Sequence, residues 1–375
     1  MEVRREPWPV APALAAAWRG WAEEAENACA TPEWLESWLE VAPGARPVVL
    51  SARLDGHPVG VLGLVAAGRP GLTRLGVPAA GAADWFSAAC EREHGAAAGA
   101  AWAAHLRAAS GWHVLGLDRV DETEGWARGF AAEAEAAAGA GGRGARLLRR
   151  GEAVLPYTDM AGGYDAWLAG RSRNFRSQLG RKRRKLERDH GLRFRRTERP
   201  QDVARDLDAV LELHAARWSD ASALGLALER FHRAWAARAF RRGWLRLWIA
   251  EADGAPVAGL YGWRLGGRFC YYQSGLSARG EELSVGTVLL AHTMEQAGAE
   301  GAVVYDFLWG DESYKDRFAT GRRTARTLVA LRPASPLGLA SAAGMLAADG
   351  ARRLPEGLRE PLRRGYRRAR SLRTR

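Results

Sequence analysis

Residues 305–318, YDFLWGDESYKDRF, place several titratable side chains at the end of an apolar run. Asp306 lies inside that run, and Tyr314 and Lys315 follow it closely. Lys315 is one of three lysines in a chain that has 52 arginines. Because lysine can lose its proton when desolvated whereas arginine stays charged, this segment is a candidate for acid–base chemistry. The alternative is a structural ion pair of Asp306 with Lys315 or Arg217.

A second candidate site lies in LSVGTVLL, where the pattern predicts the start of a helix. Ser284, Val285, Gly286 and Thr287 occupy the first positions of that helix. Free backbone N–H groups and the positive end of the helix dipole at such a position suit a phosphate or pyrophosphate. In the alternative interpretation, Ser284 only caps the helix and Gly286 only allows close packing.

Further candidates lie on the elements before this helix. His214, Arg217 and Trp218 belong to a predicted helix over 200–218, where a lone histidine is more often packed than catalytic. Tyr271, Tyr272 and Gln273 lie on a predicted strand and directly precede Ser274 and Gly275. Either tyrosine can present its hydroxyl to a ligand.

The positioning elements occur twice along the chain. Residues 50–64 and 248–263 share the pattern A-x-x-D-G-x-P-V, which predicts a β-hairpin that turns at Asp-Gly. Each hairpin precedes a helical stretch and then an apolar strand that carries an aspartate, Asp118 or Asp306. We therefore expect two copies of one α/β unit, with a mixed sheet flanked by helices.

The second copy has the clearer pattern. A basic amphipathic helix over 172–189 and two helices over 200–218 and 228–243 precede it. Three strands then form an antiparallel meander, and the helix that begins near Ser284 leads to two final strands. These five strands are expected at 244–252, 256–265, 268–275, 303–309 and 324–332.

Charge is unevenly distributed along the 375 residues, whose net charge is +12. Most of the positive charge lies in residues 171–199 and 352–375. Such segments favour polyanions, namely nucleic acid, anionic lipid or a phosphorylated substrate, although a solvated helix face has the same composition. Three scattered cysteines predict neither a disulfide framework nor a metal cluster. We find no signal peptide or membrane-spanning pattern, so a cytoplasmic protein is expected.

Five blocks together resemble a known family. In order they are SRNFRSQLGRKRRKL, LELHAARW, YYQSG, LSVGTVLL and YDFLWGDESYK. They are similar to GNAT-superfamily acetyltransferases of the CelD/BioF-like type, which are related to Fem-type peptidyltransferases. The resemblance covers about residues 165–320 and implies tandem GNAT-like units. These would be a degenerate unit over 1–160, an acyltransferase unit over 161–333 and a basic tail over 334–375.

The resemblance implies acyl transfer from acetyl-CoA or another acyl-CoA to an amine, with no metal. It places the donor's pyrophosphate at Ser284–Thr287, with Ser274 and Gly275 nearby. Asp306 would then be the base or an orienting carboxylate, Tyr314 or Tyr272 the acid, and Lys315 the group that polarises the carbonyl or neutralises a phosphate. The acceptor would contact residues His214, Arg217, Trp218, Gln273 and Trp309.

Three functions remain open at this point. The first is an acyl-CoA N-acyltransferase acting on a small-molecule or sugar amine, in envelope or exopolysaccharide assembly. The second is an aminoacyl-tRNA-dependent, Fem-like transferase, because the family's usual pair of spaced glycines is reduced to Gly286; residues 171–199 would then bind tRNA. The third is a non-catalytic binding protein. The basic tail could also contact an anionic membrane surface.

Overall fold

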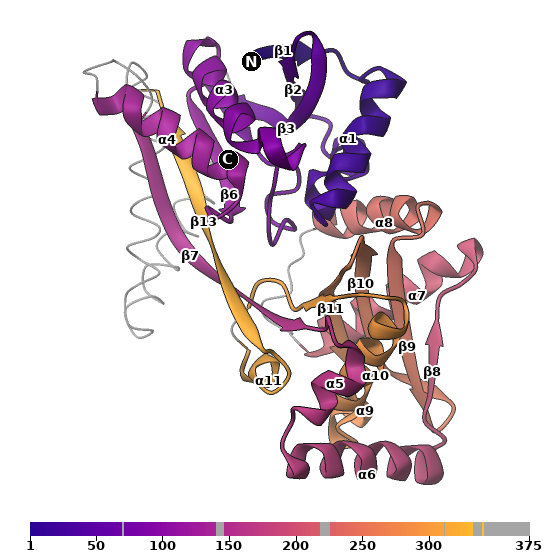
Figure 1. The fold of residues 1–375 in the computed structure, drawn as a ribbon. Helices are drawn as coiled ribbons and strands as arrows, with labels where there is room; N and C mark the ends of the chain where they lie inside the picture. Colours follow the sequence, from indigo (N-terminus) through magenta and orange to yellow (C-terminus); the bar gives the residue numbers. More distant parts are fainter. Residues whose placement is uncertain (70, 140–145, 218–225, 311, 333–339, 341–375) are drawn as a thin grey trace.

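A computed structural model describes residues 1–332 and 340, apart from residues 70, 140–145, 218–225 and 311. In this part of the chain, thirteen strands form one mixed sheet, and helices pack on its faces (Figure 1). The order across the sheet is β1-β2-β3-β4-β6-β13-β7-β12-β11-β10-β9-β8, and β5 pairs with β3. The expected mixed sheet with flanking helices is confirmed.

The N-terminal unit occupies the upper half of Figure 1. Its strands are β1 (Glu2–Glu6), β2 (Arg46–Leu54), β3 (His57–Arg69), β4 (Leu72–Gly76), β5 (Ala89–Cys90), β6 (Val114–Val120) and β7 (Arg146–Asp159). Its helices are α1 (Pro12–Glu24), α2 (Pro32–Val41), α3 (Gly95–Ala108) and α4 (Gly125–Gly139), with short 3-10 turns η1 (Ala28–Ala30) and η2 (Arg92–His94).

The C-terminal unit occupies the lower half. Its helices are α5 (Gly163–Ala169), α6 (Arg173–His190), α7 (Val203–Arg217), α8 (Leu226–Arg241), α9 (Ala278–Glu282), α10 (Val285–Ala299) and α11 (Ser313–Asp316), and the 3-10 turn η3 (Pro200–Asp202) precedes α7. Its strands are β8 (Arg193–Arg196), β9 (Leu245–Ala252), β10 (Ala255–Leu265), β11 (Arg268–Leu276), β12 (Val304–Asp306) and β13 (Gly321–Leu331).

Both predicted hairpins are present, and they agree in detail. β2–β3 turns at Asp55-Gly56 and β9–β10 turns at Asp253-Gly254, with positive φ at all four residues. Positive φ at both central residues is the geometry that favours Asp-Gly in two-residue turns. Each hairpin also has a bulge one residue after the shared proline, where the pairing register shifts. The repeat in sequence is therefore a repeat in structure.

Two long strands join the units. β7 follows the N-terminal helices but reaches β12, with Tyr157 opposite Asp306. β13 follows the C-terminal elements but pairs with β6, with Leu328 opposite Leu117. The two strands also pair with each other along their length and cross between the halves in Figure 1. The expected tail over 334–375 lies outside the described residues, except for residue 340.

The basic helix α6 is amphipathic, as predicted. Leu179 and Leu186 are buried, and Phe175 packs against the same core. The hydroxyl of Ser172 accepts a hydrogen bond from the backbone N–H of Phe175 at 3.2 Å and so caps the helix. Gly191, with φ of 57°, ends it in the left-handed conformation that glycine adopts readily. Exposed arginines such as Arg181 and Arg184 lie away from this core, whereas Arg183 pairs with Glu187 and Glu295.

Candidate functional site

The site begins where β11 and β12 separate. These parallel strands pair at three positions, and the last pair is Cys270 with Asp306. β11 continues to Leu276, whereas the chain after Asp306 follows β7, since the N–H of Phe307 donates to the carbonyl of Pro156 at 3.0 Å. The two strands therefore separate in the middle of the sheet, and we call this separation the opening.

On the α10 side of this opening lies a cavity of about 200 Å³, the inner pocket. It brings together six of the residues that the sequence nominated. Ser274, Gly275, Ser284, Gly286, Thr287 and Tyr314 all line it. Val285 does not line it, because its side chain is fully buried in the core beneath α10.

Three hydroxyls form a chain inside the inner pocket. The hydroxyl oxygen of Tyr271 lies 2.5 Å from that of Ser274 and 2.9 Å from that of Tyr314. Leu260, Leu289 and other apolar side chains make up much of the wall. The pocket thus combines a small polar cluster with an apolar end, which is typical of ligand sites.

A β-bulge determines which side chains face this pocket. The register between β10 and β11 shifts so that Tyr261 pairs with Gln273 and Gly262 with Tyr271, which leaves Tyr272 as the extra residue. Bulges often re-aim side chains next to active sites. Tyr271 and Ser274 consequently share the α10 side, although strict alternation would have separated them.

Tyr272 packs on the opposite side, against α8. Its hydroxyl lies 3.1 Å from Nε2 of His232, and burial raises the pKa of Tyr272 well above its usual value. Burial also lowers the pKa of His232 to about 3, so this histidine is neutral. Of the two predicted acids, Tyr314 and Tyr272, only Tyr314 lines the inner pocket, because the bulge directs Tyr272 towards His232. Gln273 is half-buried and does not line the inner pocket.

The start of α10 borders the inner pocket, and its role as an anion site stays a prediction. Ser284 has a φ of 53°, and its side chain makes no capping hydrogen bond. The interpretation of Ser284 as a side-chain cap is therefore wrong. The first N–H groups of a helix have no intrahelical acceptor. A Cβ at Gly286 would come to 3.2 Å from Cδ1 of Leu276, so glycine allows close packing at this position.

Gly275 has a different role from Gly286. A Cβ at Gly275 would collide with the backbone of Leu213 and His214 on α7. His214 itself is half-buried, and its Nδ1 lies 3.0 Å from the carbonyl oxygen of Ser274. Gly275 and His214 thus fix α7 against β11. The side chain of Arg217 and all of Trp218 lie outside the described residues, so their predicted roles stay predictions.

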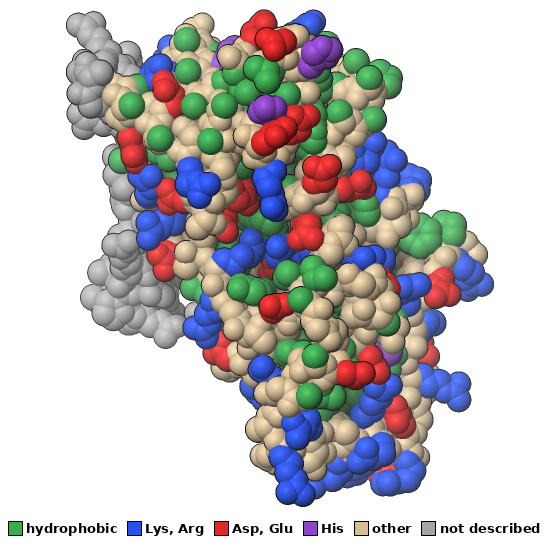
Figure 2. Space-filling view, in the orientation of Figure 1, with side chains coloured by type: hydrophobic (Ala, Val, Ile, Leu, Met, Phe, Trp, Pro, Cys, Tyr) green, Lys and Arg blue, Asp and Glu red, His purple; other side chains and the backbone are tan. Residues whose placement is uncertain are grey.

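A larger cavity of about 640 Å³, the outer pocket, adjoins the first and shares Ser284 and Thr287 with it. Arg181, Lys182 and Lys185 of α6 line it together with Arg317. The three α6 cations form no ion pair with another described residue. Figure 2 shows lysine and arginine side chains gathered at the bottom of the molecule, where α6 lies. Two of the three lysines therefore face a cavity next to a helix N-terminus.

Asp306 is held by two arginines rather than by Lys315 or Arg217. Its Oδ2 accepts from Arg268 at 3.0 Å and from Arg323, and its Oδ1 accepts from the N–H of Leu308 at 2.9 Å. Burial alone would raise its pKa, but the two arginine charges outweigh burial and hold the pKa below its usual value. Of the two roles predicted for Asp306, base or orienting carboxylate, these contacts favour the orienting carboxylate. Asp306 instead orients the loop that follows β12.

Lys315 lies on the other side of the opening from Tyr314. It is 3% exposed, and its Nζ lies 2.8 Å from Oε2 of Glu312 and 3.1 Å from the carbonyl oxygen of Trp309. Trp309 is exposed, and its ring lies 4.2 Å from the guanidinium carbon of Arg119. The short helix α11 thus presents one candidate residue to each side of the sheet.

The N-terminal unit contributes two residues that sequence reasoning missed. Asp84 lies with its Oδ1 3.8 Å from Nη1 of Arg119. Burial raises the pKa of Asp84 to about 7, although the charges of Arg119 and Lys315 oppose this rise. The sequence signal is slight, namely an acid in the small-residue run AAGAADWF. The pKa of Asp84 is thus raised, whereas that of Asp306 is lowered.

The equivalent opening in the N-terminal unit is filled. Phe86 forms a parallel bridge with Val120 beside β6. The start of α3 packs against α4 so closely that side chains at Gly99 or Gly129 would collide with the opposing backbone. The helix that corresponds to α10 therefore has no open N-terminus.

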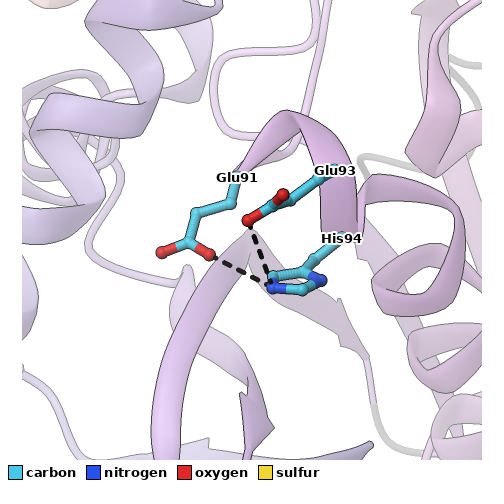
Figure 3. A group of neighbouring side chains, drawn as sticks. All are labelled: Glu91, Glu93 and His94. Carbon is cyan, nitrogen blue, oxygen red and sulfur yellow. Dashed lines mark ion pairs between the residues drawn. The ribbon is translucent and has the colours of Figure 1, made fainter.

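In the described part of the chain, one group of side chains is arranged so that it could hold a metal ion. Glu91, Glu93 and His94 each place a ligand atom within 4.8 Å of the others (Figure 3). Nε2 of His94 lies 3.5 Å from Glu91 and 3.7 Å from Glu93. The group lies at the partly exposed turn η2 of the N-terminal unit and shares no residue with either pocket.

Comparison with known proteins identifies the fold. Residues 173–316 match the family model for the acetyltransferase (GNAT) domain. The structure of FemX is similar over 91% of this chain and 99% of its own, at 12% identity and a TM-score of 0.66. A second similar structure is the C-terminal DUF2156 domain of a protein assigned as lysylphosphatidylglycerol synthetase from Agrobacterium fabrum. The similarity covers 88% of this chain and 95% of that domain, at 11% identity and a TM-score of 0.55.

A conserved protein of unknown function from Bacteroides thetaiotaomicron is also similar, over 86% of this chain and 97% of its own, at 12% identity and a TM-score of 0.53. No curated protein matches the sequence. None of the described helices has the length and apolar character needed to cross a bilayer. The likeness to these structures concerns the fold.

Proposed function

We propose that the protein is an N-acyltransferase. Residues 173–316 match the acetyltransferase domain of the GNAT superfamily, and the fold is similar to that of FemX. The protein transfers an acyl group from an acyl-CoA to the amino group of a small molecule or sugar. The observation that carries this proposal is the opening between β11 and β12, with pockets on its α10 side and charged residues on the other. Donor and acceptor can meet there from opposite faces of the sheet.

The donor's phosphates fit the outer pocket. Its cations, Arg181, Lys182, Lys185 and Arg317, surround a helix N-terminus at which the dipole favours anions. Lysine and arginine are the usual partners of phosphate groups. The thioester then extends past Ser284 and Thr287 into the inner pocket.

The amine approaches from the side of Lys315 and Asp84. Its nitrogen attacks the carbonyl carbon of the thioester, the C–S bond breaks, and the nitrogen loses one proton while the thiolate gains one. Asp84 is the group available to take the first proton, directly or through water, and Tyr314 is the group on the donor side that supplies the second. Lys315 stabilises the negative charge that develops on the carbonyl oxygen.

An aminoacyl-tRNA is the second candidate donor. The observation in its favour is that the basic surface of α6 extends beyond the outer pocket: Arg173, Arg176, Arg184 and Arg188 are exposed along its length. A polyanion longer than CoA would use this surface. FemX has the same fold, but at 12% identity this likeness does not decide between donors.

Thermal unfolding with acetyl-CoA or with bulk tRNA, each at low and moderate salt, separates these possibilities. A donor that binds only the folded state raises the melting temperature with its occupancy. We expect a shift with acetyl-CoA, and release of free CoA thiol when a panel of amines is added. A shift with tRNA alone, weakening steeply with salt, would favour the second donor. No shift with either would favour a non-catalytic binding protein.

A further inference from the structure

We propose that Trp85 positions the carboxylate of Asp84, and that it does so by resting on the two arginines that hold Asp306. The inference rests on the proposed function, in which Asp84 takes the proton of the amine, and it adds the residue that keeps this base in place. Trp85 belongs to the N-terminal unit, whereas both arginines lie on strands of the C-terminal unit. The base is thus fixed from across the boundary between the units.

Asp84 depends on such support because its own contact with a cation is a long one. Its Oδ1 lies 3.8 Å from Nη1 of Arg119, beyond the range of a normal hydrogen bond. Arg119 instead donates to the carbonyl oxygen of Ala83 at 2.6 Å. Residues 81–85 belong to no helix or strand. The direction of the carboxylate is therefore set by what fixes the residues on either side of it.

The ring of Trp85, the next residue along the chain, lies against two guanidinium groups. Cζ of Arg323 lies 4.0 Å from the ring centroid, and Cζ of Arg268 lies 5.1 Å from it. Both arginines donate to Oδ2 of Asp306, Arg268 at 3.0 Å. Trp85 is buried, and cation–π contacts are strongest at desolvated sites. The carboxylate of Asp306 therefore fixes the arginines, and the arginines fix the ring.

Further contacts hold the rest of Trp85. Its Nε1 donates to Oε1 of Glu124 at 3.0 Å, and its carbonyl oxygen accepts from Nδ2 of Asn27 at 3.3 Å. The ring also packs with apolar side chains of β7 and β13, the strands that join the units. Because Asp84 and Trp85 share a peptide bond, a ring held in this way limits where the Asp84 carboxylate can point.

Loss of this support should be detectable at Asp84 itself. The charged and titratable groups that face it are Arg119 of β6, Cys29 of η1, Tyr272 of β11, Asp306 of β12, and Glu312 and Lys315 beside and within α11. Burial outweighs the nearby cations and raises the pKa of Asp84 to about 7. A loosened segment that admits water should return this pKa towards its ordinary value.

The first test needs no acyl donor. The contribution of Asp84 to stability is full below its unfolded pKa and is lost as the pH rises through about 7. Urea titrations from about pH 4 to about pH 8 compare the unmodified protein with Trp85→Leu, Asp84→Asn and the double variant. Trp85→Leu should remove at least about half of the pH dependence that Asp84→Asn removes. In the Asp84→Asn background, Trp85→Leu should leave the pH dependence unchanged.

The double variant separates Asp84 from Glu124. Burial raises the pKa of Glu124 to about 7 as well, and Trp85 contacts this carboxyl directly. If Trp85→Leu changes the pH dependence equally with and without Asp84, the effect runs through Glu124 and the proposal is overturned.

The second test uses turnover of acetyl-CoA with an amine. Because misplacing a catalytic group by about 1 Å can cost about 100-fold in rate, Trp85→Leu should lower kcat at least about tenfold. It should move the step in the pH profile towards lower pH by about one unit or more, and change KM for acetyl-CoA by less than about twofold. Trp85→Phe keeps a ring for the two arginines and should restore most of kcat.

Trp112→Leu is the matched control. Trp112 is also buried, its Nε1 donates to the carbonyl oxygen of Leu106 at 2.8 Å, and Cζ of Arg332 lies 5.9 Å from its ring. It precedes the start of β6, whereas Arg119 lies near the end of that strand. Its replacement should lower the melting temperature but leave the pH step where it is.

The two tests fail separately. Absence of turnover with every amine would refute the acyltransferase, and the urea titrations would still decide whether Trp85 acts on Asp84. Turnover of Trp85→Leu with an unmoved pH step would overturn the positioning role and leave acyl transfer intact. Equal impairment of Trp85→Phe and Trp85→Leu would assign the effect to the bond with Glu124 instead of the arginines. Should Trp85→Leu not fold, as judged by its melting curve, Trp85→Met replaces it, because the flexible methionine side chain adapts to irregular gaps.

Discussion

The hydroxyl oxygens of Tyr271 and Tyr314 lie 2.9 Å apart, and this contact spans the opening where β11 and β12 separate. Tyr271 comes from the strand, and Tyr314 from the short helix after it. The hydroxyl of Ser274 lies 2.5 Å from that of Tyr271 and continues the chain. A proton leaving Tyr314 can therefore be replaced along a line of hydroxyls that ends inside the inner pocket.

Replacing Tyr314 with phenylalanine tests this proton path. If Tyr314 protonates the leaving thiolate, Tyr314→Phe should lower kcat about 100-fold and change the Kd for acetyl-CoA by less than about threefold. Tyr305→Phe is the matched control, because its buried hydroxyl bonds to Thr293 at 2.9 Å away from both pockets. Equal turnover of Tyr314→Phe and Tyr305→Phe in a thiol-release assay would contradict the assignment.

Lys315 and Lys185 should differ in which kinetic constant their replacement changes. Lys315→Ala should lower kcat about 100-fold, as for loss of a group that stabilises the developing oxyanion. Lys185→Ala should instead raise KM for the donor and weaken the salt dependence of KM, because it removes one charge facing the phosphates. Steady-state kinetics at two salt concentrations check both expectations. A change in KM alone at Lys315 would assign it to binding rather than to catalysis.

Asp84 should give the pH profile a step near neutrality. Burial raises the pKa of its carboxyl to about 7, so a base at this position is protonated and inactive below that pH. The charges that face it are Arg119, Lys315, Asp306 and Glu312. We expect kcat/KM to rise through about pH 7, and Asp84→Asn to abolish the step along with most activity.

The raised pKa of Asp84 should make activity rise with pH but stability fall with pH. A carboxyl whose pKa is higher in the folded state than in the unfolded state favours folding when protonated. This contribution is full below pH 4 and is lost as the pH rises towards 7. Asp84→Asn should therefore make the free energy of unfolding less dependent on pH across this window, measured by urea titration. An unchanged pH dependence in both assays would exclude a raised pKa at Asp84.

The repeat and the start of α10 could be predicted because their signals are local. An Asp-Gly turn fixes a two-residue hairpin wherever it occurs, and the start of α10 lies directly after the meander in sequence. The partners of Asp306 could not be predicted in this way. Arg268 and Arg323 reach it from β11 and β13, and only the crossing of β7 and β13 between units brings β13 near.

Asp84 was missed for the same reason. It lies in the other unit and approaches Lys315 only because both units share one sheet. The bulge at Tyr272 was also outside local reasoning, since alternation along a strand predicts that Tyr271 and Gln273 share a face. Single insertions of this kind reassign every later side chain on the strand.

Asp306→Asn should destabilise the protein rather than affect proton transfer alone. It would remove the buried carboxylate that Arg268 and Arg323 share and leave them only their longer ion pairs with Glu26 and Asp121. Breaking a buried ion pair typically costs about 3–5 kcal/mol. Because the folded pKa of Asp306 is lowered, its contribution is present above the unfolded pKa and is lost as the pH falls. Urea unfolding at pH 7 and at low pH should show the difference between protein and variant shrinking with acid.

The two pocket glycines should respond differently to alanine. Gly275→Ala puts a methyl group into the backbone of α7, so we expect the melting temperature to fall by several degrees, the usual effect of overpacking. Gly286→Ala meets only the end of the Leu276 side chain, at 3.2 Å. Its melting temperature should stay close to that of the unmodified protein, while the shift that acetyl-CoA produces becomes smaller because the methyl group narrows the start of α10. A Gly286→Ala variant that is unstable but binds acetyl-CoA fully would contradict these two assignments. Gly286 would then be needed for packing, and donor binding would have to depend on Gly275.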